Sequence, residues 1–145
     1  MRRTLALILI AAFVVSCSSE ASPEPEPEVE VLESFGHTAV AFKGDGDGFL
    51  PTVEQVSEAE AALSDYLAKN RESTDMRADW MTHNRQYAGV NTNGKQSIEI
   101  AGFCVRLEGF TEERIGVEDG GPCFWNADFE VDTGKILSIR TNGQA

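Results

Sequence analysis

The spacing of apolar residues changes along the chain, and this change restricts the fold more than any other feature of the sequence. Thr52 and Gln55 have the spacing of a capping box, directly after Pro51. From there to residue 69, apolar side chains recur at helical spacing opposite acidic ones: Val56, Ala59, Leu63, Tyr66 and Leu67 against Glu54, Glu58 and Asp65. The pattern predicts an amphipathic helix over Val53–Lys69 that lies on a sheet.

A shorter period, typical of half-buried strands, follows this helix. Arg85–Val90 and Gln96–Cys104 flank Asn93-Gly94, a dipeptide that tolerates the positive φ values of a type I′ turn. Within the second of these runs, the apolar residues move from even-numbered to odd-numbered positions. We therefore expect a hairpin with a β-bulge near Gly102, because one extra residue switches the faces of a strand.

Two further strands complete the expected sheet. Cys123–Val131 alternates cleanly, and Asp132–Lys135 turns the chain into a last strand with Leu137 and Ile139 facing inward. Phe35–Phe42 is expected to be a strand before the helix. The sequence thus predicts an α+β domain with one amphipathic helix on a four- to five-stranded antiparallel sheet, in the order strand, helix, four strands.

The first residues have the composition of a targeting segment. Arg2 and Arg3 precede the uninterrupted apolar run Leu5–Val15, which is shorter than the roughly 20 residues that a membrane span needs. Val14–Cys17 resembles the lipobox of bacterial lipoproteins. This resemblance implies a signal peptide over residues 1–16 and acyl chains on Cys17; the alternative is a chance cysteine near the end of a secretory signal or membrane segment.

An acidic stretch without a basic residue follows the lipobox. Its alternation of proline and glutamate over residues 23–28 favours an extended, solvated chain. We expect residues 17–33 to form a lipidated stalk and residues 34–145 a single domain. Ser18 stands where an aspartate commonly retains lipoproteins at the inner membrane. In a cell with two membranes, outer-membrane residence is therefore expected.

The charge of the chain excludes one class of partner. Its formal net charge is −12 at pH 7, whereas nucleic-acid binding draws its affinity from basic side chains that release counterions. We expect no nucleic-acid partner. The acidic surface is interpreted as a solvated one.

With Cys17 assigned to lipid, Cys104 and Cys123 remain as a pair in an oxidising compartment. Cys104 ends one expected strand and Cys123 begins the next, so an antiparallel meander would place them side by side. The sequence predicts a disulfide between them. A reactive or metal-binding thiol pair is the alternative, although the spacing is not C-x-x-C.

Four strings carry a resemblance that covers most of the domain: Arg85–Gly89, Phe103-Cys104, Asp119–Phe124 and Asn142-Gly143. They look like parts of small exported bacterial proteins of unknown activity, which supports the sheet and the disulfide but implies no chemistry. The order of elements also looks like that of cystatin-like folds. Cystatins inhibit cysteine proteases with a Gln-x-Val-x-Gly hairpin, and the string Gln86–Val90 has the wrong spacing for it. Protease inhibition therefore rests on analogy of fold.

Asp45 and Asp47, in a glycine-rich run, are the one weak candidate for calcium. Two carboxylates at i and i+2 can offer oxygens to a hard cation, but an EF-hand would need further oxygen ligands where Phe49 and Val56 stand. A flexible turn before the helix is the simpler interpretation. We expect no other metal and no cofactor.

No sequence motif supplies a nucleophile with a base, a zinc site or a phosphate loop. We therefore assign no catalytic residue; Asp119 is interpreted as a turn residue, with a catalytic acid as the alternative. Aromatic residues and arginine dominate binding hot spots, and the candidates for binding are Trp80, Arg85, Asp119 and Phe124, the last because it falls on the polar face of its strand.

These observations predict an exported lipoprotein, anchored to the cell envelope through acyl chains on Cys17, that acts as a non-enzymatic binding module. Its partner would be an envelope protein or a small ligand. The alternative is a small hydrolase or an enzyme inhibitor that uses the concave face of the sheet.

Overall fold

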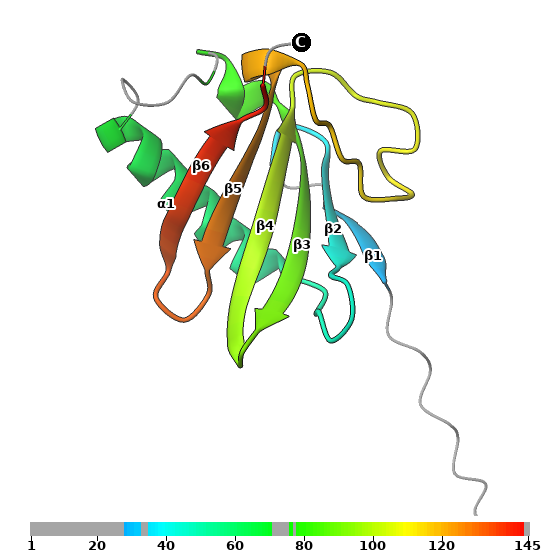
Figure 1. Ribbon diagram of the computed structural model, residues 1–145, viewed down its shortest axis with the longest axis vertical. Coiled ribbons are helices and arrows are strands. Elements are labelled where there is room, and N and C mark those ends of the chain that lie inside the picture. Colours follow the sequence, from blue (N-terminus) through cyan, green and yellow to red (C-terminus); the bar gives the residue numbers. More distant parts are fainter. Residues whose placement is uncertain (1–27, 33–34, 71–75, 77, 144–145) are drawn as a thin grey trace, which may run out of the picture.

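The computed structural model describes residues 28–32, 35–70, 76 and 78–143. Within them one α-helix lies across one face of a six-stranded sheet (Figure 1). The expected signal peptide, Cys17 and residues 23–27 of the proline–glutamate run lie outside the described residues. The elements are β1 (Val29–Leu32), β2 (Ala39–Lys43), α1 (Val53–Asn70), the 3₁₀ turn η2 (Trp80–Thr82), β3 (Asn84–Thr92), β4 (Lys95–Phe103), the 3₁₀ turn η3 (Gly121–Cys123), β5 (Phe124–Glu130) and β6 (Lys135–Thr141).

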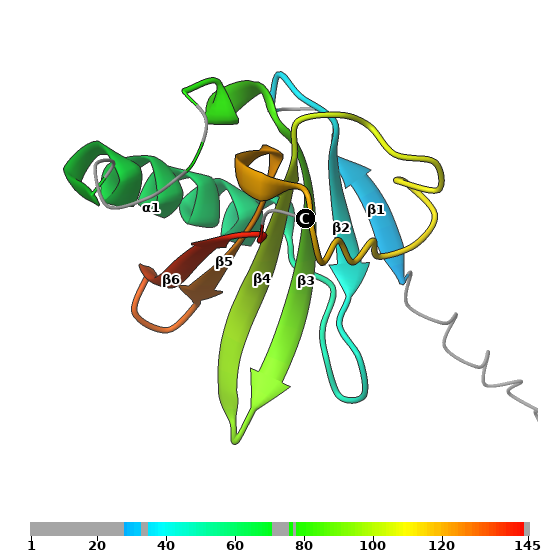
Figure 2. The same cartoon turned by 45° about the horizontal axis from the view of Figure 1, so that its top comes forward.

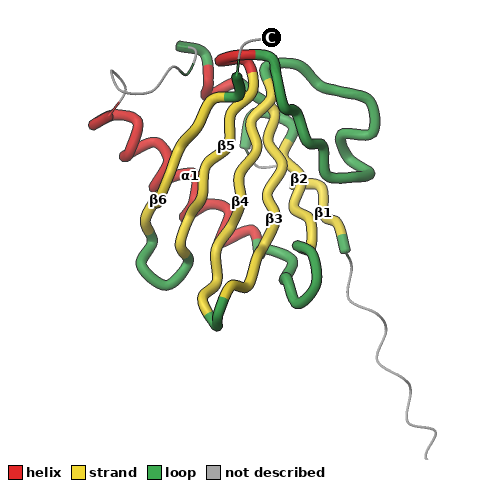
Figure 3. Tube along the Cα trace, in the orientation of Figure 1, coloured by secondary structure: helices red, strands yellow, loops and turns green. Residues whose placement is uncertain are grey.

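The strands lie in the sheet in the order in which they occur in the chain. Every neighbouring pair is antiparallel except β2 and β3, which are parallel. The parallel pair follows from the connection, because α1 returns the chain to the end of the sheet from which β2 started. Figure 3 shows α1 running diagonally behind the strands.

The α+β class and the single helix are confirmed, whereas the expected strand count of four to five and the wholly antiparallel sheet are wrong. The additional strand is β1, which lies within the residues that the sequence assigns to the stalk. Three of its four residues are exposed, and it pairs with β2 along Val29↔Phe42 to Leu32↔Ala39. Valine and glutamate alternate here over only four residues, directly after the proline–glutamate run, and both valines are exposed in the edge strand, so the sequence does not distinguish it from a solvated chain.

The predicted helix is confirmed together with its cap. The backbone N–H of Thr52 donates to Oε1 of Gln55 at 2.9 Å, and the backbone N–H of Gln55 donates to Oγ1 of Thr52 at 3.3 Å. These reciprocal bonds satisfy two amides that the first helical turn leaves without partners. The buried face of α1 consists of Val56, Ala59, Leu63 and Leu67.

The sheet carries an apolar core on each face. The larger core lies under α1 and includes Tyr87, Ile98, Ile100, Trp125 and Phe129. The smaller one, formed by Val40, Phe42, Phe103 and Phe110, lies under the loop that connects β4 to η3. In Figure 2 this loop lies next to β2 and β1, on the side away from α1.

Burial on both faces explains why no bulge occurs near Gly102. The pairing of β4 with β3 and β5 is regular there, and the change of parity reflects Ile98 and Ile100 facing α1 while Ala101 and Phe103 face the loop. The shift in register lies instead in the β5–β6 pair, between Asp128 and Phe129.

This shift also corrects the expectation for the last strand. Asp128 pairs with Ser138 and Phe129 with Ile136, so Leu137 is the extra residue. Its side chain is 58% exposed, against the inward orientation that alternation predicts. Ile136 and Ile139 pack against the core.

The predicted disulfide is present. Cys104 and Cys123 have their Cα atoms 5.1 Å apart, and the backbone N–H of Cys104 donates to the carbonyl of Cys123 at 3.0 Å. The bond closes residues 104–123 into a loop at one end of the sheet. Both ends of this loop are therefore fixed covalently relative to β4 and β5.

Candidate functional site

A buried polar cluster surrounds Arg85, on the face of the sheet that α1 covers. The Arg85 side chain is 1% exposed and its Nε lies 3.3 Å from Oε1 of Glu60 on α1. Its Nη2 donates to the carbonyl of Trp80 at 2.9 Å, and its guanidinium carbon lies 5.3 Å from the ring centroid of Trp80 and 5.6 Å from that of Trp125. Arg85 is therefore buried among these partners and presents no exposed contact.

Tyr87 and His37 complete this cluster. The Tyr87 hydroxyl donates to Oε1 of Glu60 at 2.8 Å, and Nη1 of Arg85 lies 2.7 Å from Nε2 of His37. Burial first, and the Glu60 carboxylate second, raise the pKa of Tyr87, so its hydroxyl stays protonated. Burial first, and the Arg85 charge second, lower the pKa of His37 to about 4, so its imidazole is neutral at pH 7.

A glycine makes room for the indole of Trp125 within this cluster. Gly102 is the strand partner of both Arg85 and Trp125. A Cβ at position 102 would lie 1.9 Å from Cε2 of the Trp125 ring. The absence of a side chain therefore lets the ring lie flat on β4 and reach the guanidinium of Arg85.

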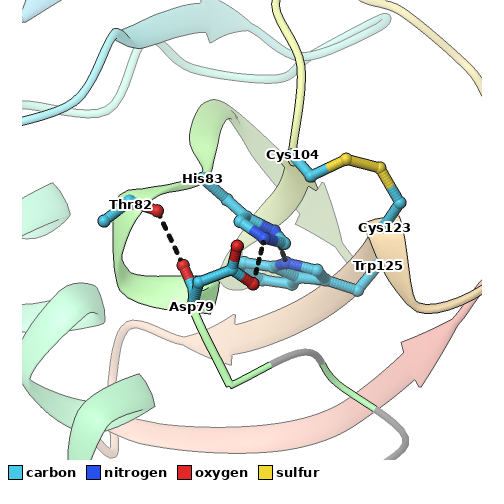
Figure 4. Close-up of a disulfide and its surroundings, with 6 residues drawn as sticks. All are labelled: Asp79, Thr82, His83, Cys104, Cys123 and Trp125. Carbon is cyan, nitrogen blue, oxygen red and sulfur yellow. Dashed lines mark hydrogen bonds and ion pairs between the residues drawn. A yellow bond between two sulfur atoms is a disulfide. The ribbon is translucent and has the colours of Figure 1, made fainter.

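His83 and Asp79 lie beside the disulfide (Figure 4). The Trp125 Nε1–H donates to Nδ1 of His83 at 3.1 Å, which leaves Nε2 to carry the proton and to face Oδ1 of Asp79 at 3.4 Å. An aspartate that orients a histidine is also a feature of catalytic triads. Here the third partner is an indole donor rather than a nucleophile, so the arrangement supports a structural role.

The opposite face of the sheet is only partly covered, and a hollow of about 360 Å³ opens beside residues 114–116 of the covering loop. We call it the central hollow. Small side chains of β3 and β4 lie at its floor, and polar side chains from five segments line it; its lining includes Asp45, Gln86, Ala88, Glu99, Ala101, Arg114, Ile115, Gly116 and Asn126. The volume falls in the range of small-ligand sites.

Gln86 fixes the wall that the loop contributes. Its Nε2 donates to the carbonyls of Phe110 at 2.7 Å and Glu113 at 2.8 Å, and its Oε1 accepts from the backbone N–H of Ile115 at 2.8 Å. The side chain is 4% exposed. One buried amide thus holds three points of the loop against β3, and the site does not need to be ordered by its ligand.

A second pair of amides holds the far end of the loop. Nδ2 of Asn126 donates to Oδ1 of Asn142 at 3.0 Å, and Nδ2 of Asn142 donates to the carbonyl of Val117. Asn126 lines the hollow. These bonds tie β5 and the end of β6 to the loop, so both ends of this wall are fixed.

Arg114 crosses the opening between the loop and the sheet. Its Nη1 lies 3.3 Å from Oδ2 of Asp45, and its Nη2 donates to Oε2 of Glu99 at 2.6 Å. On its other side lies a second hollow of about 420 Å³, the lateral hollow, whose lining includes Glu28, Val29, Phe42, Lys43, Asp45, Glu112 and Arg114. The ion pair of Arg114 with Asp45 is therefore shared by the two hollows.

The structure separates the four predicted binding residues from these hollows. Trp80 is 8% exposed and lies in the core with Arg85. Phe124 is half-buried, with its ring centroid 6.0 Å from that of Phe103. Asp119 is exposed and forms a bridge with Gly143, in a turn that the amides of Gly120 and Gly121 tie to the same carbonyl.

The residues of the central hollow were not among those predictions. The sequence offers one signal for Gln86: it is a polar residue in a strand with apolar neighbours. The residues next to it in β3 are buried. Arg114 has no such signal, because its partners lie 15 and 69 residues away in the chain.

The calcium candidates do not converge. Asp45 pairs with Arg114, and Asp47 contributes its backbone carbonyl, which accepts from Nδ2 of Asn91 at 2.5 Å. In the part of the chain that the structure describes, no group of three or more histidine, cysteine, aspartate or glutamate side chains could hold a metal ion.

The fold and the hollows define an α+β domain with one face of the sheet covered by a helix and the other partly covered by a loop, beside two hollows with polar linings. Comparison of the chain with protein-family models, curated proteins and solved structures gives no match. Among the described helices, none is long and apolar enough to cross a membrane.

Proposed function

We propose that the protein is an exported, lipid-anchored binding module and that the central hollow is its ligand site. The observation that carries this proposal is the preorganised loop, which Gln86 holds at three backbone groups and the disulfide closes at its ends. A wall fixed in this way loses little conformational entropy when a ligand binds.

Binding is favoured over hydrolysis by the chemistry of the lining. The described lining residues include no histidine, cysteine, serine or threonine, and the carboxylates of Asp45 and Glu99 are engaged by Arg114. A hydrolase would need a nucleophile or an activated water beside a general base. Inhibition of an enzyme, the other alternative, would use the same open face and gives the same first experiment.

Attachment to the membrane is the second part of the proposal. The lipobox places acyl chains on Cys17, and more than one chain makes anchoring stable. Labelling cells with a palmitate analogue is expected to label the wild type and to leave Cys17→Ala unlabelled. Label on Cys17→Ala, or none on the wild type, would contradict the anchor. Fractionation is expected to place the wild type in the outer membrane.

The site can be tested with a photo-crosslinking amino acid placed at Gly116 in the full chain in intact cells. Gly116 lines the central hollow, and a Cβ at this position meets no other atom within 4 Å. Ser64, an exposed residue of α1, is the matched control. We expect a defined adduct from position 116, absent from position 64 and reduced by Glu99→Gln. Identical adducts from both positions would contradict the proposed site.

A further inference from the structure

We infer that the central and lateral hollows form one groove that binds an extended peptide segment with basic side chains, and that the Arg114–Asp45 ion pair opens to admit it. The inference rests on the proposed function and specifies its ligand. Asp45 and Arg114 line both hollows, so the two hollows adjoin at this ion pair.

The length of the groove fits an extended chain. Its lining runs from Val29 on β1 through Phe42 on β2, Ala88 on β3 and Ala101 on β4 to Asn126 on β5. Neighbouring strands lie about 4.8 Å apart, so the groove crosses a distance of about 19 Å. An extended segment of about six residues spans that distance.

The charges of the groove select a basic ligand. Its described lining carries four carboxylates, Glu28, Asp45, Glu99 and Glu112, against the two cationic side chains of Lys43 and Arg114. The net charge of the chain is −12, which raises the local concentration of cations and disfavours anionic ligands. Nucleic acid and acidic peptides are therefore poor occupants.

The floor of the central hollow suits the stem of a lysine or arginine side chain. Ala88, which is 4% exposed, and the half-buried Ala101 line this floor on β3 and β4, together with Glu99. Long basic side chains lie along apolar surface with their charged end in a polar environment. An ammonium or guanidinium group of the peptide would therefore reach Glu99 with its stem on the two alanines.

The ion pair that divides the groove is a weak barrier. The Asp45 side chain is 100% exposed and that of Arg114 is 37% exposed, with 3.3 Å between the charged atoms. Exposed pairs of this kind contribute little to stability. A basic group of the ligand can therefore replace Arg114 at Asp45, while Arg114 keeps its bond of 2.6 Å to Glu99.

The test measures binding of a fluorescein-labelled Lys-Ala-Lys-Ala-Lys-Ala peptide to the mature full-length chain in detergent micelles, by fluorescence anisotropy. We expect Glu99→Gln and Glu112→Gln each to weaken binding about fivefold, the effect of losing a partly exposed charged contact. The control is Glu54→Gln on α1, which changes the net charge equally and lies outside the described lining. If Glu54→Gln weakened binding equally, the loss of affinity would reflect the net charge of the protein rather than the groove, and the inference would be overturned.

Arg114 gives a test of opposite sign. Arg114→Gln removes the barrier and one positive charge from the groove, so we expect it to tighten binding of the peptide. The charge-matched control is Arg140→Gln, which lies outside the described lining. We expect this control to have a smaller effect on binding. Weaker binding by Arg114→Gln would contradict the opening of the pair. Spermine that competes as strongly as the peptide would overturn the extended-peptide assignment.

Failure of the peptide to bind, with a Gly116 adduct still formed in cells, would reject the basic-peptide ligand and leave the binding site standing. Loss of the Gly116 adduct as well would reject the proposed function itself. Thermal melts of all variants verify that each one is folded.

Discussion

The Nε atom of Arg85 lies 3.3 Å from Oε1 of Glu60, and this ion pair joins the middle of the sheet to α1. The arginine side chain is 1% exposed and the glutamate 18%. The same Glu60 oxygen accepts the hydroxyl of Tyr87 at 2.8 Å. Both charges are thus taken from water, and each depends on the other to stay there.

Replacing one member of this ion pair is therefore expected to lower the free energy of unfolding more than replacing both members. Glu60→Ala leaves the Arg85 charge buried, and the free energy of unfolding should fall by about 3–5 kcal/mol. The double variant Glu60→Leu with Arg85→Met should lose less than the sum of its single changes. Urea unfolding at pH 7 of the wild type, Glu60→Ala, Glu60→Leu, Arg85→Met and the double variant measures these losses; strictly additive losses in the double variant would contradict the coupling.

Gly102→Ala should destabilise the protein through Trp125. An alanine inside a strand is normally better than glycine, but here its Cβ would lie 1.9 Å from the indole ring. We expect a loss of at least about 2 kcal/mol, since overpacking forces ring and backbone to shift, and a change in near-UV circular dichroism. The control is Gly116→Ala, where a Cβ meets no atom within 4 Å. A Gly102→Ala protein as stable as the wild type would refute the close approach.

Local signals predicted the parts of the fold that depend on neighbouring residues. The capping box of Thr52 and Gln55 forms as expected, and Asn93 and Gly94 adopt φ values of 53° and 79°, as a type I′ turn requires. The cysteine pair was predicted from the order of the strands, and that part of the meander is present in the structure.

Features that depend on distant segments were not predictable. Strand β1 is defined by its pairing with β2 rather than by its own pattern. The two apolar parities of β4 suggested a bulge, because the sequence does not indicate that the loop of residues 104–120 covers the second face. The central hollow depends on the path of that loop, so Gln86 and Arg114 could not be recognised as its residues from the sequence.

The neutral His37 predicts a pH dependence of stability. Its pKa is lowered to about 4 from 6.5, mainly by burial and next by the charge of Arg85. Between these values the unfolded chain binds a proton that the folded protein does not, so stability falls as the pH falls from about 6.5 to about 4 and levels off below. Because His37 is only half-buried and solvent screens its contact with Arg85, the loss is on the order of 1 kcal/mol.

His37→Gln should remove this decline, because an amide does not titrate and its oxygen still accepts from Arg85. Urea unfolding of both proteins at pH 7 and pH 4.5 measures the difference. The same decline in the variant would assign it to other titratable groups and contradict the role of His37.

The disulfide is expected to hold both the domain and the wall of its hollow. Reduction should add two hydrogen atoms to the mass of the oxidised domain and reveal two thiols where the folded protein has none. The double variant Cys104→Ser with Cys123→Ser should lose about 2–5 kcal/mol of stability, as small exported domains usually do without a native disulfide.

The double variant is also expected to lower the yield of the crosslinked adduct at Gly116. Residues 104–123 are then held by Gln86 and the amides of Asn126 and Asn142 without a covalent closure. Hydrogen exchange of the Ile115 amide, which donates to Gln86, reports on the loop directly. Unchanged exchange together with unchanged stability would show that the non-covalent contacts suffice, and the disulfide would then have no part in organising the site.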